Sequence, residues 1–184
     1  TITNTIEYSF NIANAHHVTL LAGHEGVASY SEALSASSEE ISDDRLTNLQ
    51  NGQKDTFSMS ESMSQSRFLS YFGRFEYSIL DKYYFDASVR NDACSRFGAN
   101  NRNATFWSAG AMWKLKNESF LRNVSWIDDL NFKASYGTQG NASIGDYQYF
   151  ALVGAMSDYA TGSSLGLGQP SNYDLTWEKQ SLLT

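Results

Sequence analysis

Alternating apolar and polar residues mark two neighbouring strands between residues 69 and 90. One face of the first strand carries Leu69, Tyr71, Gly73, Phe75, Tyr77 and Ile79, and the other carries Ser70, Arg74, Glu76 and Ser78. After a turn at residues 80–82, Tyr83, Phe85, Ala87 and Val89 alternate in the same way with Tyr84, Asp86, Ser88 and Arg90. A strand that crosses a bilayer needs about 9–11 residues, with an apolar face toward lipid and a polar face toward a lumen. The pattern therefore predicts an all-β protein, an antiparallel transmembrane β-barrel.

The same alternation predicts further strands along the chain. They are expected at residues 2–12, 18–25, 106–116, 130–137 and 147–156, with one more beginning near Leu175. We expect seven or eight strands in total, all antiparallel neighbours. Residues 27–66 lose the alternation and are rich in Ser, Glu, Asp and Gln, so we expect one long surface loop there, with room for a short helix.

The connections alternate in length, as in outer-membrane barrels, where short turns face the periplasm and long loops face outward. Short turns are expected at residues 13–16 and 80–82. Long loops are expected at residues 27–66, 91–105 and 138–146. The connection at 117–129 falls on the short-turn edge and is longer than this rule prefers.

Composition narrows the class of protein. No run approaches the roughly 20 apolar residues that a transmembrane helix requires, so the chain crosses a membrane as strands or does not cross it. Aromatic residues make up 14% of the 184 residues, which suits interfacial girdles and, equally, the preference of Tyr and Phe for strands. The net charge of -7 argues against a nucleic-acid partner. The lone Cys94 is expected to be a small loop residue.

Several ordered motifs carry a family resemblance. The runs are YFGRFEY at 71–77, DKY at 81–83, ASVRND at 87–92, SRFG at 95–98, NESFL at 117–121, KASYG at 133–137 and DLTWEK at 174–179. Together they resemble the SusC/RagA family of TonB-linked outer-membrane proteins of Bacteroidetes. Ala93 and Cys94 stand where that family commonly has Gly and Ser, and a turn with positive φ at Ala93 would be strained. The approach to Trp177, residues 169–175, also departs from the usual Asn-Pro-Asp-Leu.

The resemblance implies a bacterial outer-membrane importer. Family members are 22-stranded barrels plugged by an N-terminal domain, energised through TonB, and closed by a SusD-like surface lipoprotein. They take up oligosaccharides (glycans) or peptides, without cofactors. Residues 1–184 are accordingly expected to be a middle portion of the barrel domain, with the plug and the TonB-contacting region outside this stretch. Neither a basic segment nor an apolar signal core stands at Thr1, which also suggests a piece of a longer precursor.

Competing chemistry finds little support in the sequence. His16, His17, His24 and Glu25 could ligate zinc, but their spacing fits no established pattern, and His24 is expected on the polar side of its strand.

Asp43 and Asp44, with Glu39 and Glu40, could hold calcium but lack EF-hand order, and a solvated acidic loop is favoured. Asp81, Asp128 and Asp129 could suggest a glycosidase pair, but they fall in turns. We expect no enzymatic activity and no catalytic, cofactor or metal residue.

The remaining candidates concern ion pairs and cargo. The polar faces carry Arg74, Arg90, Lys114, Lys133, Glu76 and Asp86, which are expected to form structural ion pairs lining the lumen or touching the plug. Cargo would be met by the long loops, and no residue there can be ranked. Phe97, Phe106 and Tyr147 could stack on sugar rings, although an interface girdle is favoured for Phe106.

Two other functions stay open from the sequence. One is a soluble extracellular β-sandwich that binds carbohydrate, which would not present a continuous apolar outer band. The other is a barrel adhesin without transport, which would share the barrel and lack the plug and the TonB-contacting segment.

Overall fold

The computed structural model describes residues 1–13, 15–159 and 162–184. The chain divides into two compact units, one formed by Thr1–Val27 with Arg67–Thr184 and the other by Ala28–Ser66. No helix among the described residues is long and apolar enough to cross a membrane. The described residues are organised by β-strands, with short 3-10 turns between some of them.

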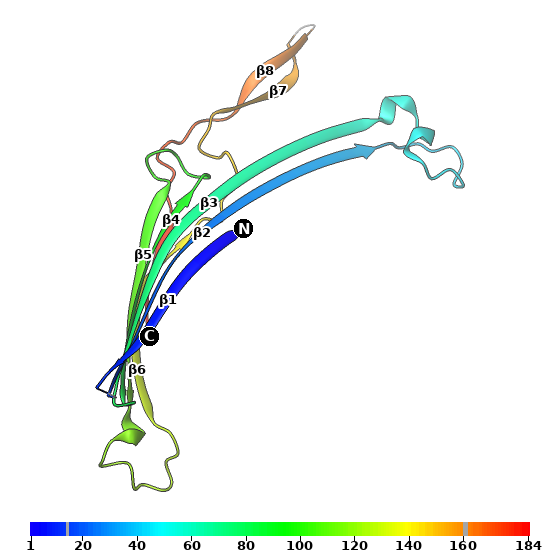
Figure 1. The fold of residues 1–184 in the computed structure, drawn as a ribbon. Coiled ribbons are helices and arrows are strands. Elements are labelled where there is room, and N and C mark those ends of the chain that lie inside the picture. Colours follow the sequence, from blue (N-terminus) through cyan, green and yellow to red (C-terminus); the bar gives the residue numbers. More distant parts are fainter. Residues whose placement is uncertain (14, 160–161) are drawn as a thin grey trace. The chain divides into compact units, whose positions relative to one another are not determined.

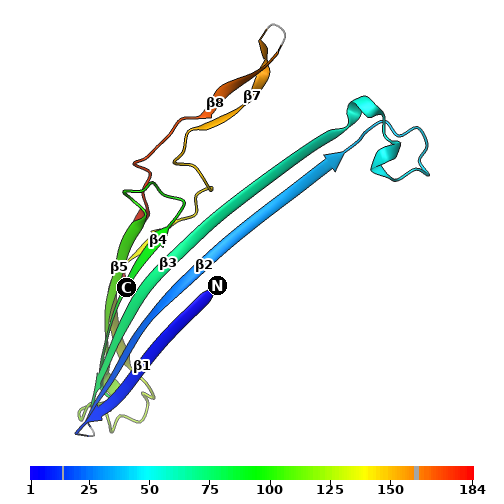
Figure 2. The ribbon, with the colours of Figure 1, turned by 45° about the horizontal axis from the view of Figure 1, so that its top comes forward.

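The main sheet has seven strands in the order β1-β2-β3-β4-β5-β6-β9 (Figures 1 and 2). Their bounds are β1 Ile2–Ile12, β2 His16–Ser37, β3 Ser58–Ile79, β4 Tyr83–Cys94, β5 Asn103–Lys114, β6 Asn131–Asn141 and β9 Glu178–Leu183. A separate two-stranded sheet pairs β7 (Leu152–Tyr159) with β8 (Gly162–Gln169). Every pair with a described register is antiparallel. The all-β antiparallel prediction is therefore confirmed.

The register keeps apolar residues on one face across the strands. Residues directly opposite each other in antiparallel strands share a face. The opposed pairs on the apolar face include Tyr8 with Leu20, Tyr77 with Phe85, Val89 with Trp107, and Trp113 with Phe132. The other face opposes Glu76 with Asp86, Ser70 with Asp92, and Ser88 with Ser108. The two faces predicted from the alternation are thus continuous over neighbouring strands.

The apolar face is uncovered. Ile6 is 72% exposed and Phe132 62% exposed, although both belong to this face. A soluble β-sandwich would bury such residues against a second sheet. The exposed face matches a sheet whose outer face meets lipid.

The predicted loop at residues 27–66 is wrong at both ends. β2 continues to Ser37 and β3 begins at Ser58, so the connection is shorter and contains the 3-10 turns η1 (Leu49–Asn51) and η2 (Lys54–Thr56). Side chains on both faces of these strand extensions are largely exposed, so neither face needs to be apolar and the alternation disappears. The main-chain hydrogen bonds between neighbouring strands can still form, because they do not depend on alternating apolar and polar side chains.

The C-terminal third differs more from the prediction. β6 continues to Asn141 instead of ending at residue 137, and β9 begins at Glu178 rather than near Leu175. The strand expected at 147–156 begins at Leu152, and β8 was not expected. Residues 162–169 contain three glycines, which weaken strands, so the sequence predicts a loop there. Pairing with β7 stabilises them as a strand despite that composition.

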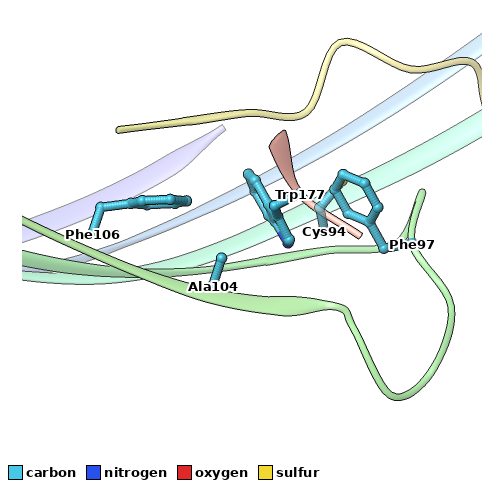
Figure 3. Packing of buried hydrophobic residues seen from close by; sticks show 5 residues of the cluster. All are labelled: Cys94, Phe97, Ala104, Phe106 and Trp177. Carbon is cyan, nitrogen blue, oxygen red and sulfur yellow. The ribbon is translucent and has the colours of Figure 1, made fainter. Parts of the chain in front are cut away.

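An aromatic cluster forms the main core of buried residues. It contains Cys94, Phe97, Ala104, Phe106 and Trp177, shown in Figure 3, and Phe68, Ala142, Ile144 and Leu175 pack around it. Trp177 lies between two rings, with its centroid 4.9 Å from that of Phe97 and 5.6 Å from that of Phe106. Phe68, Cys94, Ala104 and Phe106 occupy polar-face positions of their strands, so this apolar cluster interrupts the polar face near one end.

Two residue-level predictions fail at this cluster. Cys94 is the last residue of β4 and is buried, not a loop residue. Phe106 is only 7% exposed and packs on Trp177, so it does not belong to an interface girdle. Phe97 is 0% exposed, so its ring is not accessible to a sugar. Ala93 is a strand residue opposite Leu69 and does not have positive φ. Replacement of the family's glycine there causes no strain.

Candidate functional site

The apolar face of the main sheet is the first surface with a functional meaning, because its large side chains are exposed to the surroundings. Aromatic rings pair across the strands on this face. The centroids of Tyr77 and Phe85 are 6.4 Å apart, those of Tyr83 and Trp113 6.2 Å, and those of Trp107 and Tyr136 5.6 Å. Tyr and Trp near strand ends are typical of the boundary between lipid and water.

A shallow depression interrupts this face near Gly73. It lies over strands β1 to β4 and is lined by Ile6, Tyr8, Leu20, Leu21, Ala22, Gly73, Arg74, Phe75, Ala87, Ser88 and Val89. Its lining is almost entirely apolar. Because its lining is mostly apolar, it belongs to the face that the alternation predicts to meet lipid.

The opposite face carries paired charges. Arg90 lies 2.6 Å from Asp92 and 3.4 Å from Glu25, and its guanidinium stands 5.4 Å from the centroid of the Phe72 ring. Arg74 lies 2.5 Å from Glu76. The ion pairs predicted for the two arginines are confirmed. Partly exposed ion pairs of this kind stabilise a fold only weakly, and they leave a hydrated, charged wall.

A second depression lies on the polar side toward the short-turn end. It is lined by His17, Arg74, Glu76, Tyr77, Ser78, Tyr84, Phe85 and Asp86. Further along the same face, Ser88 and Ser108 share a hydrogen bond of 2.7 Å. Asp86 lies over Gly110, where a β-carbon would stand 2.5 Å from the carboxylate oxygen. This face offers carboxylates, guanidinium groups and hydroxyls, and it is the surface that could meet a polar molecule in a lumen.

The buried aromatic cluster ties three connections together. Arg96 donates to Asp146 at 2.7 Å and to the carbonyl of Ala142 at 3.3 Å. Trp177 Nε1 donates to the carbonyl of Arg102 at 3.1 Å. The loops after β4, after β6 and before β9 are therefore fixed to one another. Tyr147, which was considered for sugar stacking, lies in the second of these connections with a φ of 64°.

The histidines considered for zinc do not converge. His16 bonds to the Tyr77 hydroxyl at 2.7 Å, His17 to Asn11 Oδ1 at 2.7 Å, and His24 to Asn4 at 3.2 Å. His16 and His24 lie on the apolar face, since they oppose Ile12 and Asn4, whereas His17 faces the other way. The prediction that His24 lies on the polar side is wrong. Within the described part of the chain, no three His, Cys, Asp or Glu side chains gather in a metal-binding group.

The acidic candidates are also separate. Asp43 pairs with Arg45 at 2.6 Å, and Asp129 accepts a hydrogen bond from Asn131 at 2.8 Å. Hydrogen bonds from Tyr84 and then Lys114 lower the pKa of Asp81 below its usual value. Asp43, Asp81 and Asp129 each have a partner of their own, and none of these contacts joins two of the candidate acids.

Glu118 gathers donors at the short-turn edge. Its carboxylate accepts from the Tyr83 hydroxyl at 2.7 Å, from Lys82 Nζ at 3.0 Å and from Trp113 Nε1 at 3.2 Å. These bonds, first that from Tyr83, hold the pKa of Glu118 below its ordinary value of 4.5. The sequence signalled this segment only as part of the NESFL run, and two of the three donors, Lys82 and Tyr83, stand about 35 residues before Glu118 in the chain.

Comparison with known proteins agrees with this architecture. The model of the family "TonB dependent receptor-like, beta-barrel" matches residues 1–180. The chain belongs to this TonB-dependent receptor family. The two faces described above are therefore the lipid side and the lumen side of part of a β-barrel wall in the bacterial outer membrane.

Individual relatives support the same assignment. TonB-dependent receptor P26 of Formosa agariphila is 31% identical over 98% of this chain and 19% of its own length. TonB-dependent receptor SusC of Bacteroides thetaiotaomicron is 37% identical over 63% of this chain and 12% of its own. A solved structure titled "Structure of the RagAB peptide transporter" is 40% identical over 97% of this chain and 20% of that one, with a TM-score of 0.87. The SusC/RagA resemblance is confirmed.

The chain spans about a fifth of the length of the P26 and RagAB chains that it matches. These relatives are named as receptors or transporters, and none of these names describes an enzyme. What the match covers is a part of the barrel wall together with the connections at its two edges.

Proposed function

We propose that this chain is part of the barrel of a TonB-dependent importer that takes up peptides or oligosaccharides across the outer membrane. A SusD-like surface lipoprotein would cover the outer mouth, and TonB would supply energy through a region outside these residues. The observation that carries the proposal is the match over 97% of the chain to a peptide transporter, at 40% identity.

The polar face supports a role in passage of a polar cargo. It presents the hydrated pairs Arg90–Asp92 and Arg74–Glu76 with the serines Ser88 and Ser108. Such groups can exchange hydrogen bonds with peptide or sugar groups, because they are already solvated and partly exposed. An adhesin barrel would not need a lumen that lets polar cargo pass.

The test is uptake by cells that make the full-length protein. A strain lacking the gene, the same strain with the gene restored, and a restored strain without TonB would each receive labelled peptide mixtures and labelled oligosaccharides. We expect one cargo class to enter only where both the protein and TonB are present. Binding of cargo to the cell surface without TonB-dependent entry would contradict the importer and support the adhesin.

The proposed partner has its own test. The full-length protein would be purified from outer membranes in mild detergent, and the proteins that remain attached identified by mass spectrometry. A surface lipoprotein in equal amount is the expected result. Its absence from an otherwise intact preparation would contradict the lid while leaving the import assay to decide transport.

A further inference from the structure

The connection between β5 and β6 exposes two large aromatic side chains. Trp126 is 83% exposed and Phe120 is 65% exposed, and both lie in the segment 115–130. Figure 1 shows this segment extending beyond the ends of the strands that it joins. Two large exposed aromatic side chains on one loop make it a candidate contact surface.

The segment is ordered by its own hydrogen bonds. The main chain closes at its base, where Leu115 N donates to the carbonyl of Leu130 at 2.8 Å. Lys116 Nζ reaches across the loop to the carbonyl of Val124 at 2.6 Å. Arg122 N donates to the carbonyl of Glu118 at 2.9 Å. The two aromatic residues are thus presented by a folded loop.

Glu118 attaches this loop to the lipid side of the sheet. Two of its three donors, Tyr83 and Trp113, oppose each other on the apolar face. Trp113 in turn opposes Phe132 of β6 on the same face. The root of the loop therefore lies against the aromatic end of the membrane-facing band and continues that band beyond the strands.

The loop also lies at the edge of the short turns. Asn117 Nδ2 donates to the carbonyl of Asp81 at 2.9 Å, and Leu80 N donates to the carbonyl of Ala15 at 2.7 Å. These contacts bring the three connections of that edge together. In outer-membrane barrels the short turns face the periplasm.

We propose that the loop 115–130 is a membrane anchor that places Trp126 and Phe120 at the headgroup boundary of the periplasmic leaflet. Trp is suited to that boundary, because its ring is largely apolar and its N–H can still bond to water or headgroups. Arg122, which is exposed on the same loop, would meet lipid phosphate. The occupant of this surface is phospholipid, and the inference is independent of the cargo.

The test uses the full-length protein reconstituted in phosphatidylcholine bilayers, with a polarity-sensitive fluorophore on a single introduced cysteine. The test position is Trp126→Cys. Phe132→Cys is the control on the membrane-facing band, and Asn100→Cys is the control in the loop at the other edge. Cys94 is 1% exposed, which protects it from labelling in the folded protein. Lipids brominated near the headgroup or deep in the acyl chain serve as quenchers.

The anchor predicts that lipid brominated near the headgroup quenches the label at position 126 more strongly than the label at position 100, as expected for an interfacial aromatic position. Deep bromines should quench position 126 less than shallow ones do. Equal, weak quenching at positions 126 and 100 would overturn the proposal. If iodide in water also failed to quench position 126, protein and not lipid would cover the loop, which would overturn it as well.

Discussion

Gly98 shows how a single residue fixes the outer end of the polar face. A β-carbon at this position would stand 2.3 Å from the carbonyl oxygen of Tyr173, a main-chain atom that cannot rotate away. Gly98 follows Phe97 directly, so the close approach of the two loops and the burial of the Phe97 ring occur at the same place. Absence of a side chain is what allows that approach.

The variant Gly98→Ala is therefore expected to destabilise the full-length barrel by about 1–3 kcal/mol, the usual cost of overpacking. Gly26→Ala is the matched control, since nothing lies within 4 Å of a β-carbon there. Urea titration of the protein in detergent micelles measures both. Equal urea midpoints for the two variants would show that the close approach of Tyr173 does not exclude a side chain at position 98.

At the scale of the elements, the sequence predicted the strands best where one face meets lipid. β1 and the turn between β3 and β4 were placed correctly, because alternation is strict only where the two faces have different solvents. The extensions of β2 and β3 and the glycine-rich β8 have no such contrast, so their sequence pattern predicts loop. The aromatic cluster was also missed, because burial of Phe106 depends on Trp177, which is remote in sequence.

Trp177→Ala tests that cluster as a unit. The change removes ring contacts with Phe97 and Phe106 and the hydrogen bond to the carbonyl of Arg102, so we expect a loss of about 3–5 kcal/mol. Phe57→Ala is the control, because that ring is 45% exposed and lies in the connection between β2 and β3. The free energy of unfolding in detergent is the measurement. A loss at Phe57 as large as that at Trp177 would contradict the assignment of the cluster as the core.

At the scale of the whole molecule, the seven-stranded sheet is understood as part of a barrel wall. Many large apolar residues of this sheet are exposed on one face, and most of the buried hydrophobic residues that the structure describes belong to one small cluster. The motifs identified the family from sequence alone, but the zinc, calcium and glycosidase hypotheses could be judged only after the fold gave each side chain a face and a partner.

The central claim is that the two faces of this sheet meet lipid and lumen. The most direct measurement is a cysteine scan of β4 from Phe85 to Arg90 in the full-length protein, with labels exposed to quenchers dissolved in the lipid. We predict quenching at Phe85, Ala87 and Val89 and little at Asp86, Ser88 and Arg90, since successive side chains point to opposite faces. Uniform quenching along the strand, or none at any position, would contradict the account.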